Sequence, residues 1–336
     1  MSDVQHYTAS GFELQKGGTL PEARLAYRTL GALSPAKDNV VVSPTWYSGT
    51  DAGVVAGLVG VDRALNPEKY FIVIPNLLGG GVSSSPSNTP APFDRARFPL
   101  VTLYDNVRLQ QMMLRDMFGV ERVKLVAGWS MGGCQAFQWG AQFPDLVEAI
   151  APLCCSARTA HFNKVFLVSL KRALELDPVF AGGFYTQPPL AGLKAFAAIY
   201  AGWGFSEPFY RNEEFRTFNA KTAQEFVEYY WEPAFIHHDA NDLLAMLWTW
   251  YNGDISDNPI YKGDFESALR SVKARTFILP GQYDNYFPPV DSFHEASLIP
   301  GAVCRPIPST WGHMTLWNPA DRSFIDAALH EALGDA

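Results

Sequence analysis

Residues 123–140 read VKLVAGWSMGGCQAFQWG, and this stretch determines the expected fold. Its first part, Val123 to Ala127, is a run of strand-forming residues, and a helix-like apolar pattern follows the turn GWSMG (128–132). A Gly-x-Ser-x-Gly turn between a strand and a helix forces the serine backbone into a strained conformation, which glycine neighbours tolerate. It also exposes the serine Oγ at a helix N-terminus, where backbone amides favour developing negative charge. Ser130 is therefore the candidate nucleophile, and a purely structural glycine turn is the alternative.

Strand-like runs and helical patterns alternate on both sides of this turn. The strand-like runs are 23–30, 39–44, 70–76, 123–129, 147–155, 275–281 and 303–308. The helical patterns are 103–119, 133–144, 289–299 and 321–333. The later strand-like runs are almost continuously apolar, which favours strands buried on both faces of a parallel sheet. The alternation therefore predicts an α/β fold built on a doubly wound, mostly parallel sheet.

The alternation breaks in the second half of the chain, where residues 161–265 show helical patterns rich in aromatic residues. Because strand-like runs stand on both sides of this block, we interpret it as an insertion into one domain. The predicted organisation is a core of residues 1–160 and 266–336 with an inserted helical lid of residues 161–265. Such a lid would cover the carboxyl ends of the strands, where open α/β sheets bind ligands.

The composition is that of an ordinary globular protein, with 336 residues of which 48% are hydrophobic and 18% charged. A net charge of -8 and the lack of any basic block argue against nucleic acid or an anionic membrane as a partner. The most apolar segments, 54–61 and 70–78, are too short to span a bilayer. We therefore expect neither nucleic acid nor membrane as a partner.

The N-terminal sequence and the cysteines both indicate a cytoplasmic protein. The N-terminal residues MSDVQHYTAS lack the charged flank and apolar stretch of a secretory signal. The four cysteines show no CxxC spacing, and adjacent Cys154 and Cys155 are typical of core thiols at a strand end. Free thiols fit a reducing compartment, so the predicted location is cytoplasmic.

A serine hydroxyl needs a base to take its proton, and the base needs a carboxylate to orient it. Two downstream segments each follow a late strand-like run. ILPGQYDNYFPP places Asp284 in a loop after one run, and STWGHMTLW places His313 after the next. The order serine, acid, histidine is the order that accompanies this kind of turn. Ser130, Asp284 and His313 are therefore the candidate catalytic residues.

Other histidines and aspartates fit these roles less well. The competing histidines lie in helical patterns, in an irregular N-terminal segment or at a position typical of core packing: His294, His330, His6 and His161. The competing aspartates do not directly follow a core strand: Asp254, Asp257 and Asp291. The pair His237-His238 lacks the HExxH spacing of a zinc site. We therefore expect no metal and no bound cofactor.

An oxyanion in this chemistry needs two backbone N–H donors. One comes from the residue after the nucleophile, Met131, and the other from an early strand-to-helix loop. The segment NVVVSPTWYSGTDAG (39–53) supplies such a loop, and the backbone of Tyr47 is the candidate donor. The alternative is that TWYSG is only a loop that ends in glycine. Trp46 and Trp129 adjoin the two donors and are expected to line the substrate pocket.

Several longer stretches carry a family resemblance: LAYRTLGALSPAKDNVVV, GWSMGGCQAFQW, GGFYTQPPLAGL, HHDANDLL, and YDNYFPP followed by WGHMTLW. On these stretches the chain resembles the homoserine O-acetyltransferase family of the α/β-hydrolase superfamily over nearly its whole length. The resemblance implies an α/β-hydrolase fold, Ser130, Asp284 and His313 as the triad, and a ping-pong acyl-enzyme. It also implies a homodimer formed through the helical lid.

The chain departs from that family at one informative position. The acetyltransferases carry an Ala-Arg pair after the Gly-Leu of the lid, and the resemblance assigns that arginine to the carboxylate of homoserine. Here the segment reads GLKAFAAIY, which places Phe196 at the position of the arginine and in the expected substrate pocket. A phenyl ring cannot make the bidentate contact of a guanidinium. Arg211 and Arg216 are the nearby alternatives.

An early loop of the core and the rest of the lid differ in the same direction. The family's early loop His-Ala-Leu-Thr-Gly is TWYSG here, and the lid is rich in aromatic residues: Trp203, Phe205, Phe209, Tyr229, Tyr230, Trp231, Trp248 and Trp250. Any one of these is as compatible with helix packing as with a pocket. Together they predict a less polar acceptor site than homoserine needs.

Two enzymatic hypotheses and one non-enzymatic hypothesis follow. The first is a serine ester hydrolase acting on a small-molecule, short-chain ester of the acetyl type, because deacylation by water needs no amino-acid site. The alternative is acyl transfer from acetyl-CoA to homoserine or another alcohol, which uses the same acyl-enzyme and differs only in the acceptor pocket. The third is a binding protein on the same fold, and the presence of all three triad residues argues against it.

Overall fold

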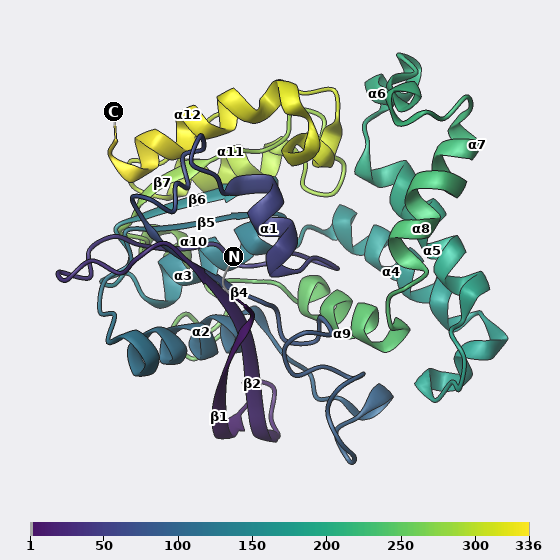
Figure 1. The fold of residues 1–336 in the computed structure, drawn as a ribbon, viewed down its shortest axis with the longest axis horizontal. Helices are drawn as coiled ribbons and strands as arrows, with labels where there is room; N and C mark the ends of the chain where they lie inside the picture. Colours follow the sequence, from purple (N-terminus) through teal and green to yellow (C-terminus); the bar gives the residue numbers. More distant parts are fainter. Residues whose placement is uncertain (1–2, 336) are drawn as a thin grey trace.

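The computed structural model describes residues 3–335, and within them a single sheet has eight strands in the order β1-β2-β4-β3-β5-β6-β7-β8 (Figure 1). The strands are β1 (Gln5–Glu13), β2 (Thr19–Leu30), β3 (Val40–Val42), β4 (Phe71–Pro75), β5 (Leu125–Trp129), β6 (Ala149–Leu153), β7 (Arg275–Ile278) and β8 (Val303–Cys304). Strands β3 to β8 pair with one another in parallel, whereas β1 pairs antiparallel with β2 and β2 pairs antiparallel with β4. The predicted doubly wound, mostly parallel sheet is confirmed.

Helices pack on both faces of this sheet. Those of the core are α1 (Asp51–Leu58), α2 (Leu103–Phe118), α3 (Met131–Gln142), α10 (Phe265–Arg270), α11 (Pro289–Leu298) and α12 (Arg322–Leu333). Figure 1 shows α12 over one face and α2 over the other. Strands β3 to β6 are buried along their whole length, which is why their sequences are continuously apolar. No helix within residues 3–335 is both long and apolar enough to cross a membrane.

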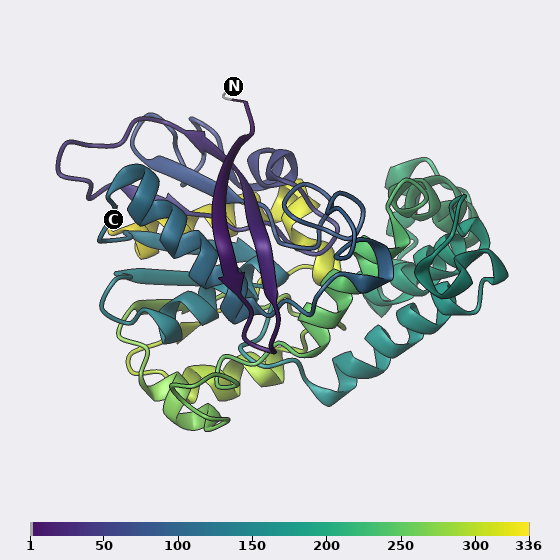
Figure 2. The ribbon, with the colours of Figure 1, turned by 90° about the horizontal axis from the view of Figure 1, so that it is seen from below.

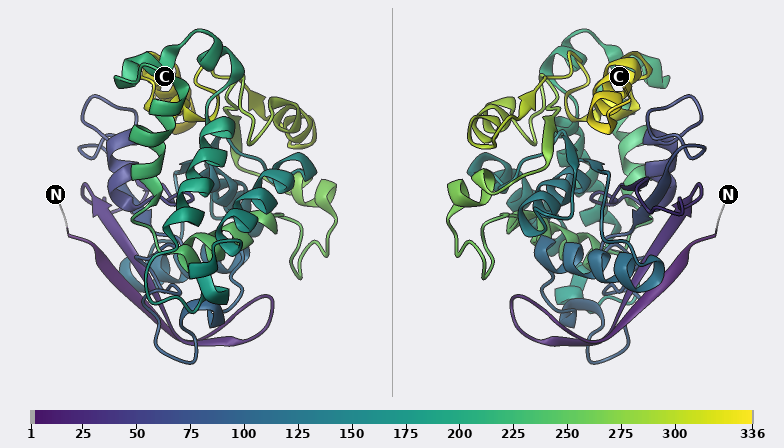
Figure 3. Two further views of the ribbon diagram at one scale, coloured as in Figure 1. Left: turned by 90° about the vertical axis from the view of Figure 1, so that its right-hand side faces the viewer. Right: turned by 90° about the vertical axis from the view of Figure 1, so that its left-hand side faces the viewer.

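The prediction that the N-terminal segment around His6 is irregular is wrong. His6 lies in β1, and β1 pairs with β2 from Gln5↔Tyr27 to Glu13↔Thr19. The long hairpin runs along the edge of the molecule (Figure 3). Most β1 side chains are exposed and only two are buried. An edge strand of this kind lacks the apolar signal that reveals the central strands.

The inserted block is helical, as predicted. Its elements are α4 (His161–Glu175), α5 (Leu190–Gly204), α6 (Glu207–Arg211), α7 (Ala223–Phe226), α8 (Glu232–Phe235) and α9 (Ala240–Tyr251), with 3-10 turns η2 (Pro178–Gly183) and η3 (Glu214–Phe218) and a π-helical turn η4 (Val227–Trp231). They separate β6 from β7 in the sequence, although these strands pair in the sheet. Helices α4 to α8 stand to one side of the sheet (Figures 1 and 2).

The last helix of this block also contacts the core. Thr249 Oγ1 in α9 donates to the carbonyl of Val101 at 2.7 Å, and the hydroxyl of Tyr47 donates to the carbonyl of Leu243 at 3.0 Å. Helix α9 therefore links the lid to the loops at the carboxyl ends of the strands. The boundaries of the lid at residues 161 and 265 stay a prediction.

Candidate active site

Ser130 lies between the end of β5 and the start of α3, with φ 58° and ψ -131°. This strained backbone is possible because the neighbouring chain segments approach very closely. A Cβ on Gly128 would overlap the carbonyl group of Gly132, and a Cβ on Gly132 would overlap the carbonyl oxygen of Pro44. Glycine at both positions thus lets α3 start directly against β5 and against the loop that follows β3. This is the geometry expected for the Gly-x-Ser-x-Gly turn, which is called a nucleophile elbow.

His313 and Asp284 lie together in the structure. Nδ1 of His313 is 2.7 Å from Oδ2 of Asp284, and both side chains are almost completely buried. The other carboxylate oxygen, Oδ1, accepts hydrogen bonds from the amides of Tyr286 at 2.8 Å and Phe287 at 3.0 Å. Three donors therefore hold this carboxylate, and hydrogen bonds to a charged acceptor are strong. The carboxylate can fix the imidazole with its proton on Nδ1 and its lone pair on Nε2.

Trp129, the residue before Ser130, contacts His313 directly. The two rings of Trp129 and His313 pack with centroids 4.6 Å apart, and Nε1 of Trp129 donates to the carbonyl of His313 at 3.0 Å. The ring of Tyr286 packs on His313 from another direction, also at 4.6 Å. Burial, followed by the nearby Tyr200 and Asp284, raises the pKa of Tyr286 well above its usual value. Its hydroxyl therefore stays neutral beside the imidazole.

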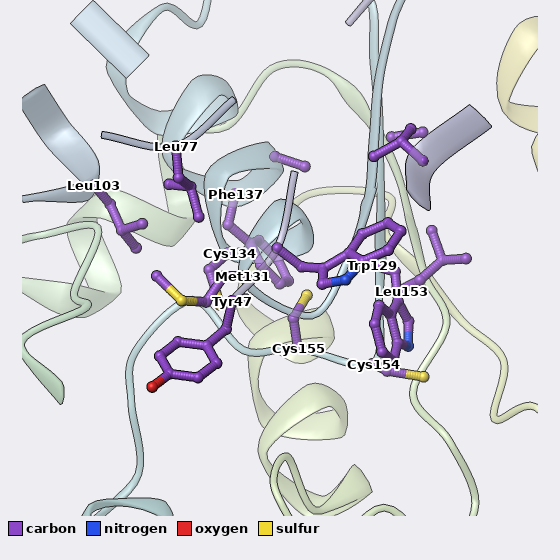
Figure 4. Close-up of a cluster of buried hydrophobic side chains, with 14 of the residues drawn as sticks. Tyr47, Leu77, Leu103, Trp129, Met131, Cys134, Phe137, Leu153, Cys154 and Cys155 are labelled. Atoms are coloured by element: carbon purple, nitrogen blue, oxygen red, sulfur yellow. The ribbon is translucent and has the colours of Figure 1, made fainter. Parts of the chain in front are cut away.

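The two predicted oxyanion donors lie on segments that are tied together. Met131 is the first residue of α3, so no carbonyl of the helix can accept its amide proton. Gln135, one turn later, donates through Nε2 to the carbonyl of Thr45 at 2.9 Å and to that of Met131 at 3.1 Å. Gln135 thereby fixes the loop that carries Tyr47 against the start of α3. Figure 4 shows Tyr47, Met131 and Trp129 in this buried cluster.

The buried side chain of Gln135 is itself held by a polar network that the sequence analysis missed. Gln110 in α2 donates to its Oε1 at 2.7 Å, and Trp139 Nε1 donates to Oε1 of Gln110 at 2.9 Å. All three side chains are fully buried. The glutamines that interrupt the apolar residues of α3 are the signal that could have revealed it, because a buried polar group needs partners.

Three tryptophans pack together at Trp129, the residue before Ser130. Trp46 packs edge-on against Trp129 with ring centroids 5.0 Å apart and against Trp317 at 6.0 Å. Trp46 and Trp129 are predicted pocket residues, whereas Trp317 is missed because it follows His313 in a 3-10 turn, η5 (Gly312–Trp317), that has no strong pattern. Ser130 is only 2% exposed in this arrangement.

Phe196 lies behind Tyr47 in the same region. It is fully buried, and its ring stacks on that of Tyr47 at 6.4 Å with an interplanar angle of 12°. The two arginines named as alternative carboxylate partners are engaged elsewhere: Arg211 pairs with Glu207 and Arg216 with Glu213, all with exposed side chains. This neighbourhood of Tyr47 is thus aromatic and apolar. Direct contact between Phe196 and a substrate stays a prediction.

The competing acidic and thiol groups have other roles in the structure. Asp254 pairs with Arg158 at 2.6 Å, and Asp257 pairs with Lys16 at 2.6 Å. Cys154, at the end of β6, contacts Thr315 Oγ1 at 3.3 Å. Burial raises the pKa of the Cys154 thiol far above its usual value, so it stays protonated and is a poor nucleophile. As predicted, Cys154 and its neighbour are buried thiols at a strand end.

A family model described as the alpha/beta hydrolase fold matches residues 52–320. The chain belongs to the α/β-hydrolase family. Within that family it is 36% identical to a probable esterase from Corynebacterium glutamicum and 35% identical to an ethyl acetate hydrolase from Pseudomonas veronii, in each case over 95% of this chain and 92% of the relative. A homoserine O-acetyltransferase from Trichormus variabilis is 30% identical over 90% of this chain and 86% of the relative. The resemblance on which the sequence analysis relies is confirmed.

Solved structures agree with this placement of the α/β-hydrolase chain. The acetyl esterase MekB superposes with a TM-score of 0.97 at 34% identity, covering 99% of this chain and 97% of the other. An acetylester hydrolase from Corynebacterium glutamicum gives 0.96 at 35% identity, covering 99% and 96%. A homoserine O-acetyltransferase from Bacillus anthracis gives 0.87 at 22% identity, which supports the shared fold alone.

Proposed function

We propose that this α/β-hydrolase is a serine ester hydrolase that acts on short-chain esters of the acetyl type. The observation that carries the proposal is the buried pair of His313 and Asp284 next to the strained turn at Ser130. The substrate class is supported by the relatives named as an ethyl acetate hydrolase and as acetyl esterases.

In the proposed acylation step, Nε2 of His313 takes the proton of Ser130 while Oγ attacks the ester carbonyl carbon. The amides of Met131 and Tyr47 stabilise the oxyanion that forms. His313 then gives the proton to the leaving alkoxide, the C–O bond breaks and the alcohol departs. Asp284 keeps the proton on Nδ1 throughout and stabilises the imidazolium, since its carboxylate is held by three donors.

Deacylation repeats the same steps with water. His313 takes a proton from water, the hydroxide oxygen attacks the acyl carbon, and the proton returns to Oγ of Ser130 as the carboxylic acid leaves. Hydrolysis is favoured over transfer to homoserine because Phe196 occupies the position of the family's arginine and the nearby Arg211 and Arg216 are paired with glutamates at the surface. No guanidinium among these three positions is free to hold an amino-acid carboxylate.

The fate of the acyl group tests the proposal. Purified protein is given p-nitrophenyl acetate, and separately acetyl-CoA with and without homoserine. We expect turnover of the ester in water that homoserine does not change and that Ser130→Ala abolishes. CoA release that requires homoserine, with little ester hydrolysis, would instead establish the acetyltransferase.

We further propose that the protein forms a homodimer through the lid and resides in the cytoplasm. The lid carries exposed large apolar side chains: Phe162, Val165, Leu176, Leu190 and Tyr229. An apolar cavity of about 340 Å³ lies between α4 and α9. A mass in solution equal to one 37.2 kDa chain would contradict the dimer.

The proposed location rests on the cysteines. All four are free thiols, which fits a reducing compartment. Recovery of the native chain outside the cytoplasmic fraction would contradict this location.

A further inference from the structure

The loop that carries His313 rests directly on the lid. Gly312 has φ 62°, and a Cβ there would lie 2.8 Å from the amide nitrogen of Ser206 and 3.1 Å from the carbonyl carbon of Phe205. Oγ of Ser206 donates to the carbonyl of Thr310. Ser206 itself is buried and caps the N-terminus of α6. The backbone before the histidine therefore packs on the lid segment between α5 and α6 without intervening side chains.

Glu214 makes a second connection between the lid and this loop. Its Oε2 accepts a hydrogen bond from Thr310 Oγ1 at 3.0 Å and another from Trp311 Nε1 at 3.1 Å. The two donors precede His313 by three residues and two residues. Because both donors share one charged oxygen, each bond is charge-assisted and the two side chains are fixed relative to one another.

The lid also holds the indole of Trp311 by packing. Its ring lies against Phe205, Phe209 and Phe218, with centroids 5.6, 5.9 and 5.3 Å away. Glu214 and Phe218 are the two ends of η3, so the same turn supplies both the acceptor and part of the apolar contact. The position of Trp311 is therefore set by lid residues.

The loop of the triad acid is attached to the same part of the lid. The hydroxyl of Tyr286, two residues after Asp284, donates to the carbonyl of Tyr200 at 2.9 Å. Nδ2 of Asn285 lies 3.5 Å from the carbonyl oxygen of Phe205. The acid loop and the histidine loop thus meet on the end of α5 and the segment after it. The relative position of Asp284 and His313 depends on how these loops seat there.

We propose that Glu214 is a positioning residue for His313, which links docking of the lid to alignment of the triad. This inference rests on the proposed ester hydrolysis. Glu214 acts through Thr310 and Trp311 and does not touch the ester, so its loss lets the histidine loop shift and lowers kcat with little change in KM. The ester is still bound, but Nε2 is less often in place to take the serine proton.

The test compares three lid variants in the full-length protein. Glu214→Ala removes the acceptor, Glu214→Gln keeps one side-chain oxygen that can accept both bonds, and Glu207→Ala is the control. Glu207 lies in the neighbouring helix α6 and forms an exposed ion pair with Arg211. We measure kcat and KM for p-nitrophenyl acetate, and the far-downfield proton resonance of the hydrogen bond between His313 and Asp284.

Glu214→Ala is expected to lower kcat about tenfold, which corresponds to losing one or two bonds to a charged acceptor. We expect it to weaken or broaden the downfield resonance, while Glu214→Gln restores most of both and Glu207→Ala changes neither. Trp311→Phe removes the N–H donor and the second ring of the indole, and it keeps one aromatic ring against the lid. It is expected to lower kcat as well, and its effect is not additive with that of Glu214→Ala because both remove the same bond.

The proposal is overturned if Glu214→Ala keeps kcat within twofold of the wild type with an unchanged resonance, or if Trp311→Phe and Glu214→Ala act additively. Should Glu214→Ala fail to fold, Trp311→Phe alone decides through the same two readouts. If the wild type hydrolyses no ester, the proposed function fails. The downfield resonance still reports whether Glu214 positions the histidine, so the two failures are distinguishable.

Discussion

Replacing Asp284 by asparagine tests the triad with almost no change in shape. In the wild type, Oδ1 accepts hydrogen bonds from the amides of Tyr286 and Phe287 at 2.8 and 3.0 Å. The amide oxygen of an asparagine must therefore take this position, because its NH₂ group cannot face two donors. The NH₂ group then points at Nδ1 of His313, which lies 2.7 Å from the replaced oxygen. Nδ1 must become the acceptor, and the ring proton moves to Nε2.

An imidazole with its proton on Nε2 cannot take the proton of Ser130. The same change of tautomer in serine hydrolases lowers kcat by about 10⁴-fold. At 1.36 kcal/mol per factor of ten, this corresponds to a loss of about 5.5 kcal/mol of transition-state stabilisation. KM should change little, because the side chain of Asp284 is completely buried and contacts the imidazole of His313 through Nδ1. Asp284→Asn should thus separate catalysis from binding.

The assay is steady-state hydrolysis of p-nitrophenyl acetate, with thermal unfolding as a check that the variant folds. Asp291→Asn is the matched control, since Asp291 is half-buried on α11 and near His294 rather than the triad. We expect the control to retain wild-type kcat. A folded Asp284→Asn variant whose kcat lies within tenfold of the wild type would refute the reasoning, because the tautomer would then not matter.

Three further substitutions test the nucleophile elbow and the lid. Gly132→Ala should lower stability by about 1–3 kcal/mol and reduce kcat, because the new Cβ would overlap the carbonyl oxygen of Pro44. Gly202→Ala, in a helix with open space around it, should instead raise the melting temperature. Equal effects of the two substitutions on the melting temperature would contradict the account. Asp242→Asn tests a buried carboxyl in α9 that accepts hydrogen bonds from the amide and hydroxyl of Ser87 at 3.0 and 2.6 Å. Burial raises the pKa of Asp242 to about 7, so between roughly pH 4 and pH 7 the folded chain keeps a proton that the unfolded chain loses, and stability falls as the pH rises. The free energy of unfolding is measured with urea at pH 4 and at pH 8. From pH 4 to pH 8 the wild type should lose on the order of 4 kcal/mol more than Asp242→Asn, because asparagine does not titrate. Equal losses in the two proteins would contradict the raised pKa.

The central sheet could be predicted from the sequence because its strands are buried on both faces and read as apolar runs. Most of β2 lies in the predicted run 23–30, but β1 could not be predicted, since it buries only Ala9 and Phe12 among nine residues and its pairing is made by backbone groups. The short turns of the lid could not be predicted from the sequence either. A π-helical turn such as Val227–Trp231 depends on tertiary packing and has no periodicity of its own.

The candidate triad could be predicted because each residue follows a strand in the order that the elbow implies. What the sequence does not reveal is how distant segments meet. Trp317 joins Trp46 and Trp129 from a third part of the chain, and Gln135 ties the two oxyanion loops together through buried carbonyls. These contacts depend on the three-dimensional course of the loops. No spacing along the chain encodes them.

Trapping the acyl-enzyme tests the central claim most directly. The protein is mixed with p-nitrophenyl acetate, quenched in acid during steady-state turnover, digested and analysed by mass spectrometry. We predict one acetyl group on the peptide that contains Ser130, lost when the ester is exhausted and absent in Ser130→Ala. Turnover without acetylation of Ser130, or with acetyl transferred to another residue whose loss abolishes activity, would contradict the account.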